Sequence, residues 1–211
     1  MLASVISSGA ILAMLQVLPA VAMPTISNMD ASPIPGYGIE VLVWEVETTP
    51  GGPTVDVAGT VQNVYEELEK INPSFVSDFG LGDSDNSTSL AAPVASRGYS
   101  IESIHCDWGG DYATGQTILE GIKYLRGVPG QPKGGPGPGN CARVSCSYNS
   151  AIYWCNDSTY TKILDSFGSI AWAAESLVGS CGGGGLWYTL QVRGQIFMTD
   201  HWNVIIRKDK C

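Results

Sequence analysis

Two histidines are the first side chains to consider for catalysis, because imidazole changes its charge near neutral pH. His105 precedes Cys106-Asp107, and His201 follows Asp200. Neither histidine belongs to a G-x-S-x-G or H-E-x-x-H motif, and the spacing singles out no nucleophile. We therefore assign no catalytic residue and expect surface or turn-capping roles for both histidines.

Acidic side chains offer two further chemistries. The segments 83–86 and 106–111 carry aspartates, but neither shows the twelve-residue calcium pattern with its terminal glutamate. We interpret both as turns and expect no metal and no other cofactor. Twenty Asp and Glu residues also leave open a pair of carboxylates for glycoside cleavage, an alternative that depends on their separation in space.

Cysteines are confined to the second half of the chain. An even number of cysteines in an exported protein predicts disulfides, here three of them. A zinc site is not expected, because no C-x-x-C pair occurs and the histidines lack helical i, i+4 spacing. Fifteen pairings remain open. The six residues are Cys106, Cys141, Cys146, Cys155, Cys181 and Cys211.

Six tryptophans are many for 211 residues. Most of them lie in strand or helix patterns, for which core packing is the simpler interpretation. A stacking platform for sugar rings is the alternative, and its candidate binding residues are Trp108, Trp187 and Trp202. Two N-x-S/T sequons also predict glycosylation, at Asn86 and Asn156, as in proteins that pass through a secretory pathway.

The first 22 residues have the pattern of a secretion signal. Residues 2–22 contain no charged side chain, and their apolar stretch ends in Pro19 and then Ala20-Val21-Ala22. Small residues at this spacing fit a signal peptidase, so we predict a signal peptide over 1–22. The apolar stretch is shorter than the roughly 20 residues that a membrane span needs. We therefore expect a secreted, extracellular protein with no membrane span.

The part before residue 99 contains no cysteine. A Pro, Ser and Asn rich stretch over 23–38 predicts a flexible leader. A strand over 39–48, a Pro-Gly turn, a short strand over 54–58 and a helix that begins after Thr60 and ends before Pro73 make up a front piece over 39–78. Gly, Asp, Ser and Asn residues over 79–98 predict a linker loop.

The remainder, 99–211, is predicted to be the disulfide-stapled core. Its pattern predicts a strand over 99–106, a helix over 112–126, an exposed Gly and Pro rich loop over 127–140 and a hairpin over 141–156 that turns at Asn149-Ser150. A helix from Tyr160 to its end at Gly179 and strands over 186–197 and 202–206 follow. Hairpins mixed with helices predict an α+β fold, an antiparallel sheet with helices packed on one face.

Three segments resemble small secreted cysteine-rich proteins of filamentous fungi. They are the cysteine hairpin at 141–157, the closing segment from Gly194-Gln-Ile-Phe through 202–207 to Cys211, and the front block with Val43-Trp-Glu-Val and Gly59-Thr-Val-Gln. The layout of cysteines, helices and glycine-rich loop is also similar to that of smut-fungus killer toxins and necrosis-inducing effectors. These resemblances imply a compact α/β sandwich that acts on other cells without a known catalytic centre.

The function that we expect is therefore a secreted, effector-like or toxin-like monomer that binds a component of a host or competitor cell and has no enzymatic activity. A net charge of -9 repels nucleic acid and anionic lipid, which excludes them as expected partners. Two alternatives remain: a carbohydrate-active hydrolase that uses paired carboxylates, and a module that binds cell-wall polysaccharide through exposed tryptophans.

Overall fold

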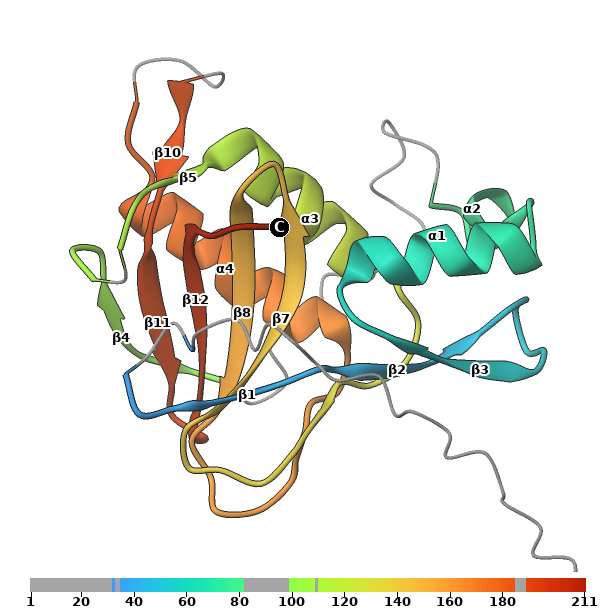
Figure 1. The fold of residues 1–211 in the computed structure, drawn as a ribbon, viewed down its shortest axis with the longest axis horizontal. Coiled ribbons are helices and arrows are strands. Elements are labelled where there is room, and N and C mark those ends of the chain that lie inside the picture. The colour runs from blue at the N-terminus through green and yellow to red at the C-terminus, as the bar shows by residue number, and fades with distance from the viewer. Residues whose placement is uncertain (1–31, 33–34, 82–98, 109, 185–188) are drawn as a thin grey trace, which may run out of the picture.

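The computed structural model describes residue 32 and residues 35–81, 99–108, 110–184 and 189–211. The predicted signal peptide, most of the leader and most of the linker lie outside these residues. The α+β architecture is confirmed: a six-stranded sheet carries helices on one face (Figure 1). All neighbouring strands are antiparallel except β1 and β7, which are parallel. In spatial order the strands are β1 (Gly38–Glu40), β7 (Asn140–Ser147), β8 (Ser150–Asn156), β12 (Trp202–Lys208), β11 (Gly194–Met198) and β4 (Ile101–His105).

The hairpin of β7 and β8 forms the centre of the sheet. Successive side chains of β8 point to opposite faces, so that Trp154 belongs to the core under the helices and Tyr153 to a smaller core on the other face. Tyr148 and Asn149 form the turn with φ angles of 43° and 56°. A two-residue turn of this kind requires positive φ at both positions. The turn therefore lies one residue earlier than predicted.

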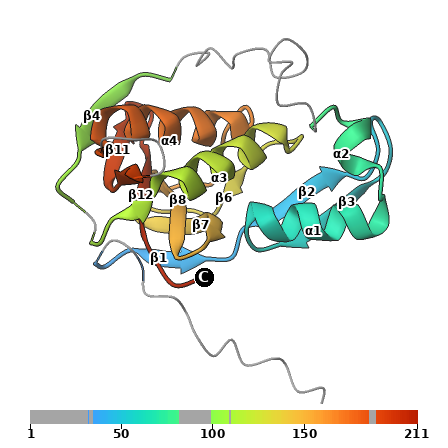
Figure 2. The same ribbon diagram turned by 90° about the horizontal axis from the view of Figure 1, so that it is seen from above.

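Two helices, α3 (Gly115–Gly127) and α4 (Phe167–Cys181), cover one face of the sheet (Figure 2). The predicted start of α4 at Tyr160 is wrong, because residues 162 and 163 form β9 (Lys162–Ile163), which pairs with β6 (Lys133–Gly134). This pairing buries Lys162, whose Nζ lies 3.6 Å from a carboxylate oxygen of Asp200. The helix also continues past Gly179 to Cys181.

The Gly and Pro rich segment 127–140 is not the fully exposed loop that its composition predicts. It contains β6, and both Gly134 and Gly139 are buried. A Cβ atom on Gly134 would lie 3.0 Å from the Trp154 ring, so any other residue would force the indole or the backbone to shift. The segment therefore packs against the central hairpin.

The strand predicted over 186–197 is divided as well. Its described part contains β10 (Gln191–Val192), which pairs with β5 (Ala113–Thr114), and then β11. Gly194 separates the two pairings with a φ of 146°, a conformation that side chains rarely adopt. Glycine at this position lets the chain leave one sheet and enter another.

The front piece shares one hydrophobic core with the stapled part. Its elements are β2 (Val43–Glu47), β3 (Thr54–Ala58), α1 (Val61–Ile71) and α2 (Phe75–Asp78). The strand predicted over 39–48 is two strands, of which β1 joins the main sheet and β2 pairs with β3. Fully buried Trp44 stacks on Phe167 of α4, with 4.1 Å between ring centroids. The piece is thus held by packing instead of by cysteines.

A chain of hydrogen bonds crosses the face of the sheet that α3 and α4 leave open. Gln195 donates to Asn203 at 3.0 Å, and Asn203 donates to one carboxylate oxygen of Asp157 at 2.7 Å. The other oxygen of Asp157 accepts a 2.9 Å bond from the Tyr37 hydroxyl. Because Gln195 and Asn203 are buried, these bonds satisfy polar groups that would otherwise be costly. Tyr37, predicted to lie in the flexible leader, is instead fastened to the sheet.

Tyr37 makes the stability of the fold depend on pH. Burial, with help from the hydrogen bond to Asp157 and its negative charge, raises the pKa of the Tyr37 hydroxyl from 10.0 to about 12. The folded state thus holds this proton more tightly than the unfolded state. The contribution of the Tyr37 hydroxyl to the free energy of unfolding is therefore complete below pH 10 and is lost between pH 10 and about 12.

We expect Tyr37→Phe to lower the free energy of unfolding by about 1 kcal/mol at neutral pH, the usual worth of one such hydrogen bond. The difference between wild type and variant should shrink as the pH rises through this window. Urea unfolding at a series of pH values measures it. Tyr65 is also buried, and its pKa is also raised. Because Tyr65 is present in both proteins, its effect on the pH dependence cancels in the difference between them. A difference that stays constant with pH would contradict the assignment.

Candidate functional site

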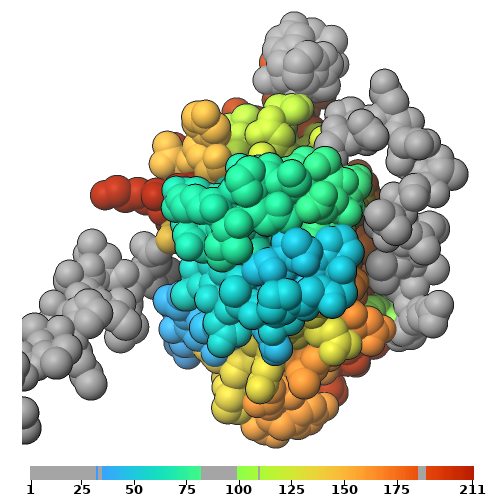
Figure 3. Space-filling view, turned by 90° about the vertical axis from the view of Figure 1, so that its right-hand side faces the viewer, coloured from blue at the N-terminus to red at the C-terminus, as the bar shows by residue number. Residues whose placement is uncertain are grey.

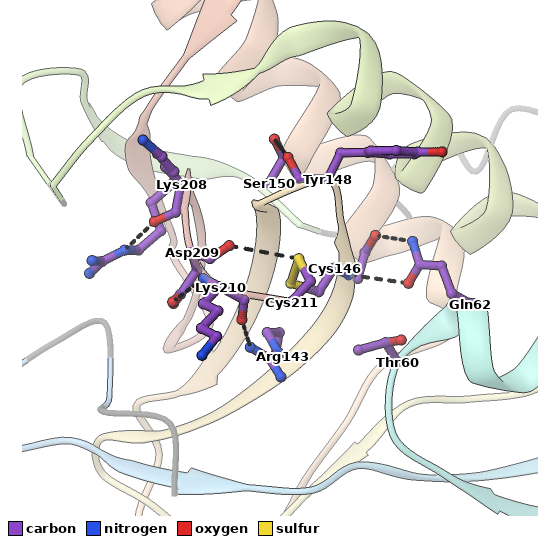
Figure 4. The surroundings of a disulfide bond; sticks show 12 residues. Thr60, Gln62, Arg143, Cys146, Tyr148, Ser150, Lys208, Asp209, Lys210 and Cys211 are labelled. Atoms are coloured by element: carbon purple, nitrogen blue, oxygen red, sulfur yellow. Dashed lines mark hydrogen bonds between the residues drawn. A yellow bond between two sulfur atoms is a disulfide. The ribbon is translucent and has the colours of Figure 1, made fainter. Parts of the chain in front are cut away.

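Three disulfides join the six cysteines, which confirms the predicted staples. One bridge links directly opposite residues of β7 and β8, one ties the C-terminal residue to β7 (Figure 4), and one joins the end of β4 to the last residue of α4. The pairs are Cys141–Cys155, Cys146–Cys211 and Cys106–Cys181. The structure thereby selects one of the fifteen possible pairings.

The polar contacts around the disulfide between Cys146 and Cys211 connect neighbouring elements of the fold (Figure 4). The Gln62 side chain of α1 accepts a 3.1 Å bond from the Cys146 amide and donates a 2.8 Å bond to the Ser145 hydroxyl. Arg143 donates to the carbonyl of Lys210 at 2.9 Å. These contacts fasten both α1 and the C-terminal residues to β7.

The two histidines do not come together. His105 pairs with Gln195 at one end of β11, whereas His201 lies in the turn beyond the other end. His201 has a φ of 64°, and its carbonyl accepts a 3.0 Å bond from the Asp157 amide, which is a turn role. Within the described part of the chain, no three His, Cys, Asp or Glu side chains converge on a possible metal position.

One of the three tryptophans of the alternative stacking platform, Trp202, is buried. Trp202 has no exposed surface, and the Tyr99 ring meets its indole edge-on at 5.4 Å, so Trp202 cannot stack on a sugar. Its position at the start of β12 points it under the helices. Trp108 is half-buried against the core on the open sheet face. Trp187 lies outside the described residues.

The predicted glycan at Asn156 is incompatible with the folded structure. Asn156 is 1 % exposed, and its Nδ2, the atom to which a glycan would be attached, donates to the carbonyls of Gly135 and Tyr160 at 2.8 and 2.7 Å. Its Oδ1 accepts from the Ser158 amide at 2.8 Å. The sequon therefore encodes a local turn. Asn86 lies outside the described residues.

An open groove of about 540 Å³ runs over the outer face of the β2–β3 hairpin. Strand alternation builds it: Trp44 and Val46 point into the core, so the residues between and after them point outward. The far wall comes from the segment after α3 and from β9. The lining residues are Val43, Glu45, Glu47, Thr54, Asp56, Pro129, Gly130, Gln131, Lys133 and Ile163.

Carboxylates dominate this groove. Glu45 lies directly opposite Asp56 in the β2–β3 pairing, where the Cβ atoms of such neighbours are about 5 Å apart and like charges are destabilising. Glu47 accepts a 2.8 Å bond from the Gly51 amide in the hairpin turn. Lys133 is the one basic residue in the lining. The groove therefore presents a negative potential beside a small apolar wall that includes Ile163.

A second hollow of about 390 Å³ lies between β3 and α1 and shares Asp56 with the groove. Its helical wall carries Glu66 and Glu67. Lys70 also lines it, but Lys70 pairs with Glu66 at 3.2 Å and with Glu67 at 3.4 Å. The hydrogen bond and charge of Glu66 raise the pKa of Lys70, so this lysine is charged at neutral pH. The two hollows form one acidic face, which we define as Glu45, Glu47, Asp56, Glu66 and Glu67.

Most of the negative charge of the chain is concentrated on the front piece. Residues 39–78 hold eight acidic side chains and one lysine, a net charge of -7 out of -9 for the whole chain. This face was not among the sites expected from the sequence. Strand alternation carried the signal, because the pattern that places Trp44 inside also places Glu45 and Glu47 together outside.

Comparison of the chain with protein-family models, curated proteins and solved structures finds no match. The resemblance to secreted fungal proteins therefore stays a prediction. Three disulfides are compatible with an extracellular location. None of the helices in the described ranges has the length and apolar character of a membrane span.

Proposed function

We propose that the chain is a secreted, non-enzymatic protein of the effector or toxin-like kind, which binds a positively charged component of a host or competitor cell. The observation that carries this proposal is the acidic face of the front piece. It combines two hollows with five carboxylates and two lysines, Lys133 and the already paired Lys70. A cationic ligand would be attracted over a distance and then bound by several weak ion pairs.

The charge of the acidic face also argues against several classes of ligand. Nucleic acids and anionic lipids carry the same charge and would be repelled. Among the described residues, no aromatic side chain lines either hollow, so a neutral sugar polymer would find no ring there on which to stack. Trp202 is buried and therefore offers no surface to a polysaccharide.

Reversing two charges of the acidic face should abolish most of the binding. We expect Glu45→Lys/Asp56→Lys to weaken binding to target cells about tenfold or more, because two attractions become two repulsions. The pair changes sign together, so the repulsion between the two strands is kept and folding should be unaffected. Labelled protein applied to plant leaf tissue and to competing fungal cells, at low and at high salt, provides the measurement.

Glu102→Lys/Glu120→Lys is the matched control. It changes the net charge by the same amount at two exposed positions on β4 and α3, and it should bind like wild type. Equal loss in both variants would show that net charge, and not this face, determines binding. Absence of binding and of any response in leaf tissue and in fungal cells would overturn the proposal.

A carbohydrate-active hydrolase is the second candidate, favoured by the opposed carboxylates of Glu45 and Asp56 in a groove. Both side chains are exposed, whereas the general acid of a glycosidase normally occupies a desolvated site. The two functions separate cleanly. A hydrolase would release reducing ends from polysaccharide, and Glu45→Gln and Asp56→Asn would each stop this release, whereas a binding protein releases none.

A further inference from the structure

β3 is an edge strand with a free side. It pairs with β2 on one side, and no other described strand pairs with it. The Thr48 amide donates a 3.0 Å hydrogen bond to the Pro53 carbonyl, and the Gly59 amide donates a 2.9 Å hydrogen bond to the Leu42 carbonyl. These two bonds flank the ladder and determine which residues of β3 face β2.

Hydrogen-bonded pairs alternate along an antiparallel ladder. Val55 and Val57 therefore bond to β2, and Thr54, Asp56 and Ala58 direct their N–H and C=O groups away from it. These three residues are exposed, and none is proline. Each contributes one donor and one acceptor, so the edge presents three donors and three acceptors in strand geometry.

The hollow between β3 and α1 lies along this edge. Asp56, Val57 and Ala58 form one of its sides, and Asn63, Glu66, Glu67 and the paired Lys70 of α1 form the other. Figure 3 looks onto this side of the molecule, where α1 lies beside the hairpin at the surface. An added strand would therefore run between a backbone that can bond it and a helix that carries negative charge.

The charge of the edge selects its occupant. A second copy of the chain would place the acidic groups of one edge against those of the other, and like charges directly opposite each other are destabilising. A segment rich in lysine or arginine would instead place positive charges beside these acidic groups, which is favourable. Successive side chains of an added strand point to opposite faces, so one set would lie beside Asp56, with Glu45 one strand further away, and the other set would face Glu66 and Glu67.

We propose that an extended basic peptide segment of the target binds along β3 as a third strand of the β2–β3 sheet. This inference rests on the proposed function and specifies its ligand as a polypeptide. Backbone hydrogen bonds to Thr54, Asp56 and Ala58 supply the strand geometry, and the carboxylates of the acidic face supply the preference for basic side chains.

The test uses a nine-residue peptide of alternating lysine and threonine, added to the full secreted protein. A second peptide carries N-methyl groups on all of its amides, which keeps its charge and removes the donors on both edges. We expect the methylated peptide to bind about tenfold or more weakly, because it has no unmethylated edge to turn toward β3. Equal binding of the two peptides would overturn the inference.

Amide hydrogen exchange by NMR provides the second readout. Binding should slow exchange at Thr54, Asp56 and Ala58 and leave Val55 and Val57, which are already bonded to β2, unchanged. Unchanged exchange at the three outward amides would also refute the added strand.

An oligomer of amino sugar, which is cationic but has no peptide backbone, distinguishes the two proposals. Suppose that the amino-sugar oligomer binds as tightly as the lysine peptide and that neither compound slows amide exchange on β3. The acidic face would then bind cations without strand addition, and only this inference would fail. If neither compound binds at low salt, the proposed function fails with it.

Discussion

Replacing Trp44 by alanine should lower the free energy of unfolding by about 3 to 5 kcal/mol, the range for deleting a buried aromatic side chain. Trp44 has no exposed surface and stacks on Phe167 with 4.1 Å between ring centroids. Its Nε1 also donates to the Gly59 carbonyl at 2.8 Å. The substitution would open a cavity between the hairpin and α4, and it would leave the Gly59 carbonyl without this donor.

Urea unfolding followed by near-ultraviolet circular dichroism measures this loss. Val43→Ala is the matched control, because Val43 is the preceding residue on β2 and is 54 % exposed. A surface change of this kind usually alters stability by less than about 0.5 kcal/mol. If Trp44→Ala were equally mild, the front piece would not share the core of the stapled part.

Removing the bridge between Cys106 and Cys181 should have an effect of similar size. The two residues are 75 positions apart, and the loop-closure model gives about 4.5 kcal/mol for a loop of that length. Because total stabilities are about 5 to 15 kcal/mol, the double alanine variant would be marginally folded. The bridge joins the end of the edge strand β4 to α4, and among the described strands β4 pairs with β11 alone, so this edge should unfold first.

The comparison variant removes the bridge between Cys141 and Cys155, which are 14 positions apart. The same model gives about 3 kcal/mol for this shorter loop. Urea unfolding without reductant should therefore rank the two variants in this order. The opposite order would mean that packing around each bridge, and not loop length, controls its contribution.

Local pattern predicted the elements well where one face of an element is apolar along its whole length. The helix after Thr60 and the hairpin of β7 and β8 are found where expected, because each is encoded by neighbours in the sequence. The helix expected from Tyr160 shows the limit. Its apolar spacing continues upstream of Phe167, but pairing of Lys162 and Ile163 with β6 takes precedence over it.

Single-residue functions were predicted less well, because they depend on burial. Trp202 and Asn156 each stand in a sequence context that is also found at surfaces, a turn-flanked tryptophan and an N-x-S sequon. In the fold, strand pairing places Trp202 under the helices and surrounds Asn156 with backbone groups. The exposure of a side chain depends on which other segments pack against it. The neighbouring residues in the sequence therefore could not show that Trp202 and Asn156 are buried.

By itself, the sequence determined most of the element types, the α+β class and the presence of three disulfides, since hydrophobic period and cysteine number are local or compositional properties. Only the tertiary structure decided which cysteines pair, that the front piece packs into the common core, and that Glu45, Asp56 and Glu66 lie on one acidic face. The reason is physical: contacts between distant segments depend on how whole elements pack together.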